Sequence, residues 1–259
     1  MLKLSSFTID TRLDGLTLSF DGGTWDTGGV KPTFHLHYAD KFTFKALGNG
    51  GLTLPVAGGK TVNVARAISG DGPIIKTGEG TLVFETQGKW DSTITTKTPL
   101  EDPVSLATTG LLDVREGTVR VESGACRAGG AYRTDIGASV DFSGNTLGAA
   151  SFAGSGSFAN FSASGATIFS DGEGVAVPQF SSASFGGITR VDFGGTPETP
   201  FAWQGVVDLP VARFAGDAPN LSGWRVSGIG VSNIGGRFSF SDGVVRVSLV
   251  RKGYVITFR

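Results

Sequence analysis

Ile68–Phe84 has the sequence ISGDGPIIKTGEGTLVF. Two Gly-x-Gly steps flank an apolar pair and a lysine, and a Thr-Leu-x-aromatic run closes the stretch. Glycine adopts positive φ angles at low cost, so each Gly-x-Gly step predicts a sharp turn of the backbone. The alternating run that follows predicts a short strand with one buried face. The stretch therefore indicates short strands joined by tight glycine turns.

The same alternation recurs along the chain, while no window of about a dozen residues carries the apolar stripe and caps of an amphipathic helix. Examples are Gly15–Phe20, Phe42–Phe44, Leu52–Leu54, Leu111–Val114, Thr118–Val121 and Val140–Phe142. Repetition at this scale is typical of stacked coils. We therefore predict an all-β fold built as a stack of parallel β-helix coils. The residues expected in its core are Ile68, Ile74, Leu82, Phe84, Leu112, Val114, Val119, Val121, Val140 and Phe142.

The pattern changes near Gly194–Pro200, where coils rich in Gly, Ser and Phe give way to two tryptophans and β-branched runs. We expect residues 1–195 to form the β-helix repeat region and residues 196–259 to form terminal coils and a cap. Val244–Val250 and Tyr254–Phe258 are expected to pair as a β-hairpin across a turn at Arg251–Gly253. Such a cap would cover the last apolar layer and the open edge of the stack.

The composition excludes several classes of protein. The 22 Lys and Arg nearly balance the 23 Asp and Glu, so no basic excess is available for a nucleic-acid backbone. The single cysteine, Cys126, excludes an internal disulfide framework and a multi-cysteine metal site. No apolar run approaches the roughly 18 residues of a membrane helix, so we expect no membrane insertion. Met1–Phe20 lacks the continuous apolar stretch of a secretory signal peptide, so we expect any export signal to lie upstream.

The repeated phrases resemble the autotransporter-associated β-strand repeat of bacterial surface proteins. The first phrase of the repeat matches Ile68, Gly70, Gly72, Ile74, Lys76, Gly78, Gly80, Thr81 and Leu82. Later phrases match Gly137, Val140, Asp141, Phe142 and Gly144, and Gly154-Ser155-Gly156 supplies the closing step. The resemblance covers about Gly51 to Gly165 and is interrupted between Gln87 and Thr109. It implies a right-handed parallel β-helix (a solenoid), a passenger-type location on the cell surface or in the medium, and no enzymatic residue.

Four groups of residues are candidates for chemistry or binding. His35 and His37 share one face of a strand and could ligate a metal with Asp40, although a closed site needs three or four ligands. We therefore interpret both histidines as polar residues on a solvent-facing strand. Polysaccharide-cleaving β-helices use paired carboxylates, sometimes with a basic residue. The candidates for that role are Asp91, Glu101, Asp102, Asp113 and Arg115, and no spacing singles out a pair.

Cys126 has a neighbouring cation in Arg127, which could lower the pKa of its thiol. The simpler interpretation is a small apolar residue near a turn. Trp25, Trp90, Trp203 and Trp224 could stack on sugar rings, or they could fill the core. The sequence thus assigns no catalytic, cofactor-binding or metal-binding residue, and we expect no cofactor.

The favoured function is a non-enzymatic structural or adhesive segment of a bacterial surface or secreted repeat protein. Its partners would be surface polysaccharides or ligands on host or other cells. The alternative is a carbohydrate-active β-helix, either a polysaccharide lyase or a hydrolase, or a carbohydrate-binding module. An enzyme should gather two or three carboxylates and a basic residue on one face, whereas a stalk should show scattered charge.

Overall fold

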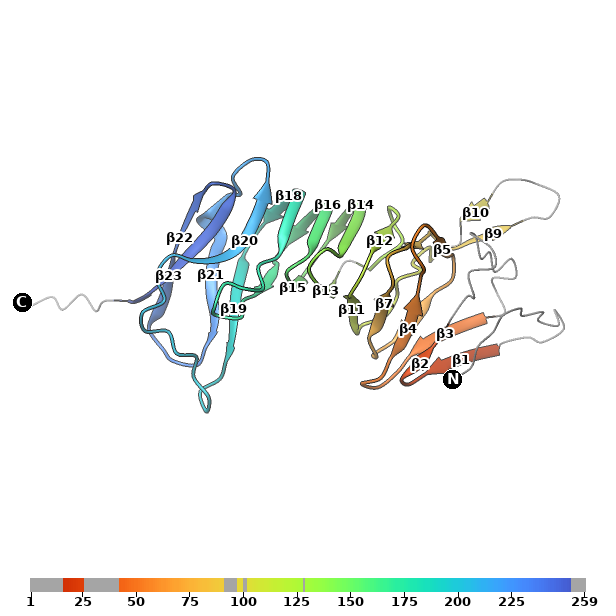
Figure 1. The fold of residues 1–259 in the computed structure, drawn as a ribbon, viewed down its shortest axis with the longest axis horizontal. Helices are drawn as coiled ribbons and strands as arrows, with labels where there is room; N and C mark the ends of the chain where they lie inside the picture. Colours follow the sequence, from red (N-terminus) through yellow and green to blue (C-terminus); the bar gives the residue numbers. More distant parts are fainter. Residues whose placement is uncertain (1–15, 26–41, 91–96, 100–101, 128, 253–259) are drawn as a thin grey trace, which may run out of the picture.

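The computed structural model describes residues 16–25, 42–90, 97–99, 102–127 and 129–252, and its regular structure is almost entirely β (Figure 1). The strands are β1 (Leu16–Phe20), β2 (Gly23–Thr24), β3 (Phe42–Ala46), β4 (Leu52–Pro55), β5 (Thr61–Val64), β6 (Ile68–Gly70), β7 (Ile74–Thr77), β8 (Thr81–Phe84), β9 (Gly88–Trp90), β10 (Lys97–Pro99), β11 (Leu111–Val114), β12 (Thr118–Val121), β13 (Gly130–Thr134), β14 (Ser139–Leu147), β15 (Ala150–Gly154), β16 (Ser157–Ser164), β17 (Thr167–Phe169), β18 (Gln179–Gly186), β19 (Thr189–Gly195), β20 (Leu209–Ala215), β21 (Trp224–Ile229), β22 (Ile234–Ser241) and β23 (Val244–Arg251). The helical structure in the described residues is one short 3-10 turn, Leu221–Gly223. The predicted all-β class is confirmed.

Two nine-stranded sheets organise the molecule. Sheet B has the order β2-β4-β7-β11-β13-β15-β17-β19-β21, and sheet C has the order β22-β23-β20-β18-β16-β14-β12-β8-β5. A smaller sheet A has the order β1-β3-β6. From β11 to β21 the successive strands alternate between sheets B and C, and each strand from β11 to β19 pairs in parallel with the strand two places later. Strands β1 and β2 lie at one end of the elongated arrangement, and β22 and β23 lie at the other (Figure 1).

The parallel pairs are in register, so identical positions of successive strands lie above one another. In sheet C this register produces a continuous ladder of buried residues: Val62, Leu82, Val119, Val140, Phe158, Phe180 and Phe214. In sheet B the ladder is Leu112, Tyr132, Phe152, Ile168 and Val191. Because paired strands are about 4.8 Å apart, each ladder residue contacts the next one.

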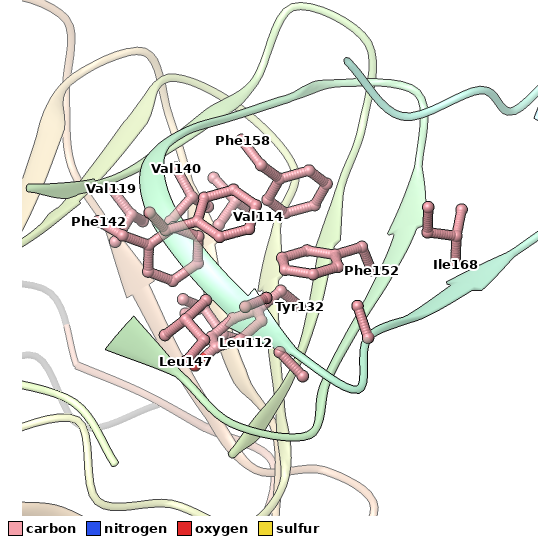
Figure 2. Close-up of a cluster of buried hydrophobic side chains, with 14 of the residues drawn as sticks. Leu112, Val114, Val119, Tyr132, Val140, Phe142, Leu147, Phe152, Phe158 and Ile168 are labelled. Carbon is pink, nitrogen blue, oxygen red and sulfur yellow. The ribbon is translucent and has the colours of Figure 1, made fainter. Parts of the chain in front are cut away.

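The inward faces of the two sheets meet in an apolar core that becomes aromatic toward the later strands (Figure 2). The rings of Phe158 and Phe180 stack with centroids 5.8 Å apart, and Phe152 contacts Phe158 edge-on at 5.0 Å. Both geometries are favourable for aromatic pairs. All ten residues predicted for the core are buried, so that prediction is confirmed.

Both glycines of the first Gly-x-Gly step lie where a side chain would not fit. Gly70 has a φ of 105°, which side chains other than glycine rarely adopt. At Gly72 an added Cβ would lie 2.6 Å from main-chain atoms of Leu47, in the turn that follows β3. An added Cβ at Gly70 would lie 2.1 Å from the carbonyl oxygen of Ala46, so Gly70 both makes the turn and, like Gly72, allows close approach to the chain at the end of β3.

Strands β14, β16 and β18 each bend where one residue takes a left-handed conformation. These residues are Ser143, Asn160 and Ser182, with φ between 48° and 58°. Beside this bend the buried Asn145 donates to the carbonyls of Val121, Glu122 and Phe142, and its amide oxygen accepts from the Gly124 N–H at 2.8 Å. One side chain thereby satisfies main-chain groups of β14 and of the end of the neighbouring strand β12.

The repeat pattern is interrupted between Gln87 and Thr109, and the described strands at the start of this stretch belong to neither large sheet. Strands β9 and β10 pair there as an antiparallel hairpin. The side chain of Gln87 holds the base of this insertion, because its amide donates to the carbonyls of Asp102 and Val104 and its oxygen accepts from the Ala67 N–H. Leu106 then bridges in parallel to both Ile68 and Cys126, which returns the chain to the stack.

The described C-terminal hairpin differs from the predicted one. Strand β23 contains the predicted strand Val244–Val250, but it pairs antiparallel with β22 and, along its other edge, with β20. The hairpin turn is Asp242-Gly243, with φ values of 51° and 72°. Arg251, expected in the turn, is the last residue of β23, and Tyr254–Phe258 lies outside the described residues. The prediction overlooked Asp-Gly, a strong signal for a two-residue hairpin turn.

Candidate functional site

The structure brings two of the predicted carboxylate-site candidates, Asp113 and Arg115, into one charge cluster on the outer face of sheet B. Arg115 Nε donates to Asp113 Oδ2 at 3.0 Å. Arg133, which pairs with Asp113 across β11 and β13, places its Nε 3.6 Å from Asp113 Oδ1. Arg133 also donates to Asp135 Oδ1 at 3.0 Å. These four residues form the Asp113 cluster.

Register in the sheet explains why the cluster forms. Asp113 and Arg133 occupy equivalent positions of successive strands, so their side chains point outward side by side. The two arginines cover Asp113, whose side chain is only 4% exposed. The sequence alone indicated Asp113 and Arg115, and it missed Arg133 and Asp135. The missed signal was the 20-residue offset between phrases, which places Leu111 against Ala131 and therefore Asp113 against Arg133.

The Asp113 cluster keeps the guanidinium of Arg133 protonated. The hydrogen bond to Asp135 and the charge of Asp113 raise the pKa of Arg133, so the guanidinium stays protonated. A general acid or base needs a pKa near the working pH and must reach the substrate. Asp113 lies under the two arginines and its side chain is only 4% exposed, so its carboxylate is not presented to a substrate. The geometry therefore suits bracing of adjacent strands better than proton transfer.

The other carboxylate candidates do not join this cluster. Asp102 is exposed in the connection that precedes β11, and its carboxylate accepts from the Val104 N–H at 3.1 Å. Asp91 and Glu101 lie outside the described residues. His35, His37 and Asp40 also lie outside them, so the interpretation of the histidines remains a prediction. Within the described ranges no group of three or more His, Cys, Asp or Glu is placed to hold a metal ion.

Lys76 is a second buried charge. It pairs with Leu54 on one side and Val114 on the other in sheet B, so its stem lies in the core. Burial lowers the pKa of Lys76 to about 8, while the charge of Glu116 opposes this shift. A lysine with such a pKa can act in catalysis when it faces a substrate. The ammonium instead donates to three main-chain carbonyls, those of Thr77, Gly78 and Glu116, which identifies it as a clamp on the turns.

Cys126 is half-buried, and burial raises the pKa of its thiol to about 11. This shift is opposite to the one that a neighbouring cation would cause. Because the thiolate is the nucleophile, the thiol of Cys126 is unreactive near neutral pH. Tyr132, whose pKa is also raised by burial, lies in the same part of the core. The interpretation of Cys126 as a small apolar residue is therefore the better one.

Of the tryptophans whose side chains are described, one is buried in the core and two are half-buried. Trp224 is buried, which excludes it as a sugar platform. Trp25 stacks on Phe44 with centroids 4.9 Å apart. Trp203 is half-buried, and the guanidinium of Arg251 lies 6.0 Å from its ring centroid. Trp90 is in β9, but its side chain lies outside the described residues.

In the part of the chain that the structure covers, there is no helix with the length and apolar character needed to cross a membrane. No family model, no curated protein and no solved structure matches this chain.

Proposed function

We propose that the chain folds as a right-handed parallel β-helix, in which one coil passes from a strand of sheet B through sheet C to the next strand of sheet B. The alternation of β11 to β21 between sheets B and C, with parallel pairs in both, supports this path. Crossovers between parallel strands of one sheet are right-handed in about 98% of cases, which favours that hand. On this path residues 1–195 form the repeat region, and residues 196–259 form the terminal coils and the β-hairpin cap.

The proposed role of this β-helix is a non-enzymatic structural or adhesive segment of a bacterial surface or secreted repeat protein. The observation that carries the proposal is the unbroken ladder of buried residues from Val62 to Phe214 in sheet C. A stack with one continuous core is suited to reach, rigidity and presentation of its surface. The mutual pairing of charges in the Asp113 cluster is consistent with a structural role for these residues. The partners would be surface polysaccharides or ligands on other cells.

The test is incubation of the purified protein with a panel of acidic and neutral polysaccharides. Released reducing ends and unsaturated products are then measured. The proposal predicts no product above that of heat-unfolded protein. Product release would instead identify a carbohydrate-active enzyme, and binding without product would identify a carbohydrate-binding module. Small-angle scattering should give an elongated particle, and protease treatment of intact source cells should degrade the protein if it is on the surface.

A further inference from the structure

Asp102-Pro103 is the one Asp-Pro step of the sequence, and it lies in the stretch that interrupts the repeat pattern. Both residues belong to the part of the chain that the structure describes, and Asp102 is exposed. The bond to a proline nitrogen is a tertiary amide, and this nitrogen is more basic than that of other peptide bonds. An aspartate carboxylate can also close a five-membered ring on its own main-chain carbonyl carbon. The Asp102–Pro103 bond therefore combines a good leaving group with a neighbouring nucleophile.

Gln87 holds the chain on both sides of this bond. Its side-chain amide Nε2 donates to the carbonyl oxygen of Asp102 at 3.2 Å and to that of Val104 at 2.8 Å. Its main-chain N–H donates to the carbonyl oxygen of Pro103 at 2.7 Å. The Gln87 side chain is itself fixed, because its Oε1 accepts from the Ala67 N–H at 3.2 Å. A donor fixed on a carbonyl oxygen stabilises the negative charge that develops there when the carbon is attacked.

The Asp102 carboxylate is turned toward the same peptide group. Its Oδ1 accepts from the Val104 N–H at 3.1 Å, and this bond folds the side chain over the residues that follow Asp102. Within the described ranges Oδ2 accepts no hydrogen bond and joins no ion pair. One carboxylate oxygen is thus held, and the other is available as a nucleophile. A simple Asp-Pro turn would share the bond to Val104, but it needs no donor on the Asp102 carbonyl.

We propose that the chain cleaves itself between Asp102 and Pro103. Oδ2 of Asp102 attacks its own main-chain carbonyl carbon, while the Gln87 amide stabilises the charge on the carbonyl oxygen. The bond from this carbon to the Pro103 nitrogen then breaks, and the nitrogen keeps the electron pair and takes up a proton from the solvent. One water molecule opens the cyclic anhydride left on Asp102. The products are a chain that ends at Asp102 and a chain that begins at Pro103, so the net reaction is hydrolysis of one peptide bond.

The two products would stay together because the large sheets cross the cut. Strand β7 pairs with β11 in sheet B, and β8 pairs with β12 in sheet C. Ile68 also bridges to Leu106, and the Thr108 hydroxyl contacts the carbonyl oxygens of Gly70 and Gly72. Cleavage would therefore free two chain ends without separating the fragments. This inference goes beyond the proposed scaffold role and does not depend on it.

The test incubates the full chain in a buffer at pH 5 and quantifies the fragments 1–102 and 103–259 by mass spectrometry. The same protein unfolded in guanidinium chloride gives the ordinary acid lability of the bond. We expect the folded chain to cleave about tenfold faster than the unfolded chain, because only the fold positions the carboxylate and the donor. Gln87→Ala should lower the rate to that of the unfolded chain. The matched control Gln179→Ala changes an exposed glutamine in β18 and should leave the rate unchanged.

Two further variants test the chemistry while leaving Gln87 in place. Asp102→Glu keeps the negative charge but would have to close a six-membered ring, and Pro103→Ala replaces the leaving group. Each should slow cleavage about tenfold, since ring size and leaving group both enter the step. Circular dichroism and thermal unfolding of every variant show whether it is folded like the parent.

Equal cleavage rates in the folded and unfolded parent would overturn the proposal, because the bond would then have only its ordinary lability. Cleavage at this bond that persists in Asp102→Ala would also overturn it, since the nucleophile would come from elsewhere. Size-exclusion chromatography of the cleaved parent should give one peak that contains both fragments. Separate peaks would contradict the inference that the sheets hold the fragments together. None of these measurements involves polysaccharide, so failure here is distinguishable from failure of the proposed scaffold role.

Discussion

The Lys76 ammonium donates a hydrogen bond to the main-chain carbonyl of Glu116, 3.0 Å away and 40 residues further along the chain. The carboxylate of Glu116 in return accepts from the Gly78 N–H at 2.8 Å. The turn after β7 and the turn after β11 are thus joined by two reciprocal contacts. Lys76 precedes the second Gly-x-Gly step of the sequence, and in the structure it ties the turn at residues 78–80 to the turn at residues 115–117.

Lys76→Met should remove a pH dependence of stability. The folded pKa of Lys76, about 8, lies below the ordinary value of 10.5, so the unfolded chain binds a proton between these values that the folded chain has released. Stability contributed through Lys76 therefore rises as the pH increases through about 8. The free energy of unfolding of the parent minus that of Lys76→Met should rise between pH 7 and pH 9.5, as measured by urea denaturation.

The control for this measurement is Lys60→Met, because Lys60 is an exposed lysine in the turn between β4 and β5. The free energy of unfolding of the parent minus that of Lys60→Met should not change between pH 7 and pH 9.5. A flat difference for Lys76→Met as well would mean that its ammonium is not desolvated in the folded protein.

Leu82→Ala should destabilise the protein by about 2–5 kcal/mol, as expected for a large-to-small change in a packed core. Leu82 is fully buried in the sheet C ladder between Val62 and Val119. Ile136→Ala, at a highly exposed position, should change the free energy of unfolding by less than about 0.5 kcal/mol. If chemical denaturation shows an equally small change in the free energy of unfolding for both variants, Leu82 does not lie in the packed core.

Asn145 offers a test of the hydrogen bonds between coils. Asn145→Ala should cost about 1–3 kcal/mol, because buried carbonyls of Val121 and Phe142 lose their donor. Asn145→Asp should be less stable than Asn145→Ala at pH 7, since an ionised carboxylate would face carbonyl oxygens. Its stability should recover toward that of Asn145→Ala at pH 4, where the carboxyl is increasingly protonated. If Asn145→Asp is no less stable than Asn145→Ala at pH 7, this side chain does not act as a donor to the coil below.

The core could be predicted from the sequence because alternation fixes which side chains face inward. Leu82 and Phe84, or Val119 and Val121, differ by two positions and share a face of their strand. Contacts between coils could not be predicted in the same way. The pairing of Asp113 with Arg133 depends on the number of residues between β11 and β13, and the spacing between paired strands varies along this chain because turns and insertions differ.

The exposed valines show a second limit of sequence patterns. Val175 and Val207 are apolar residues in Gly- and Pro-containing stretches, and composition does not separate them from the buried Val177. Only the placement of the turns outside the stack exposes them. The C-terminal hairpin is the opposite case, since Asp242-Gly243 between two alternating runs was a readable turn signal.

Truncation before Asp242 should make the protein aggregate or lose cooperative unfolding. Strand β23 lies between β20 and β22 and buries Val245 and Val247, so its removal would expose the edge of β20 and the last apolar layer of the stack. Truncation after Lys252 keeps β23 whole and serves as the control. Size-exclusion chromatography and thermal unfolding of both proteins provide the measurement. If the shorter protein remains monomeric and as heat-resistant as the control, then β23 does not cap the stack, and the end of sheet C must be closed by another part of the chain.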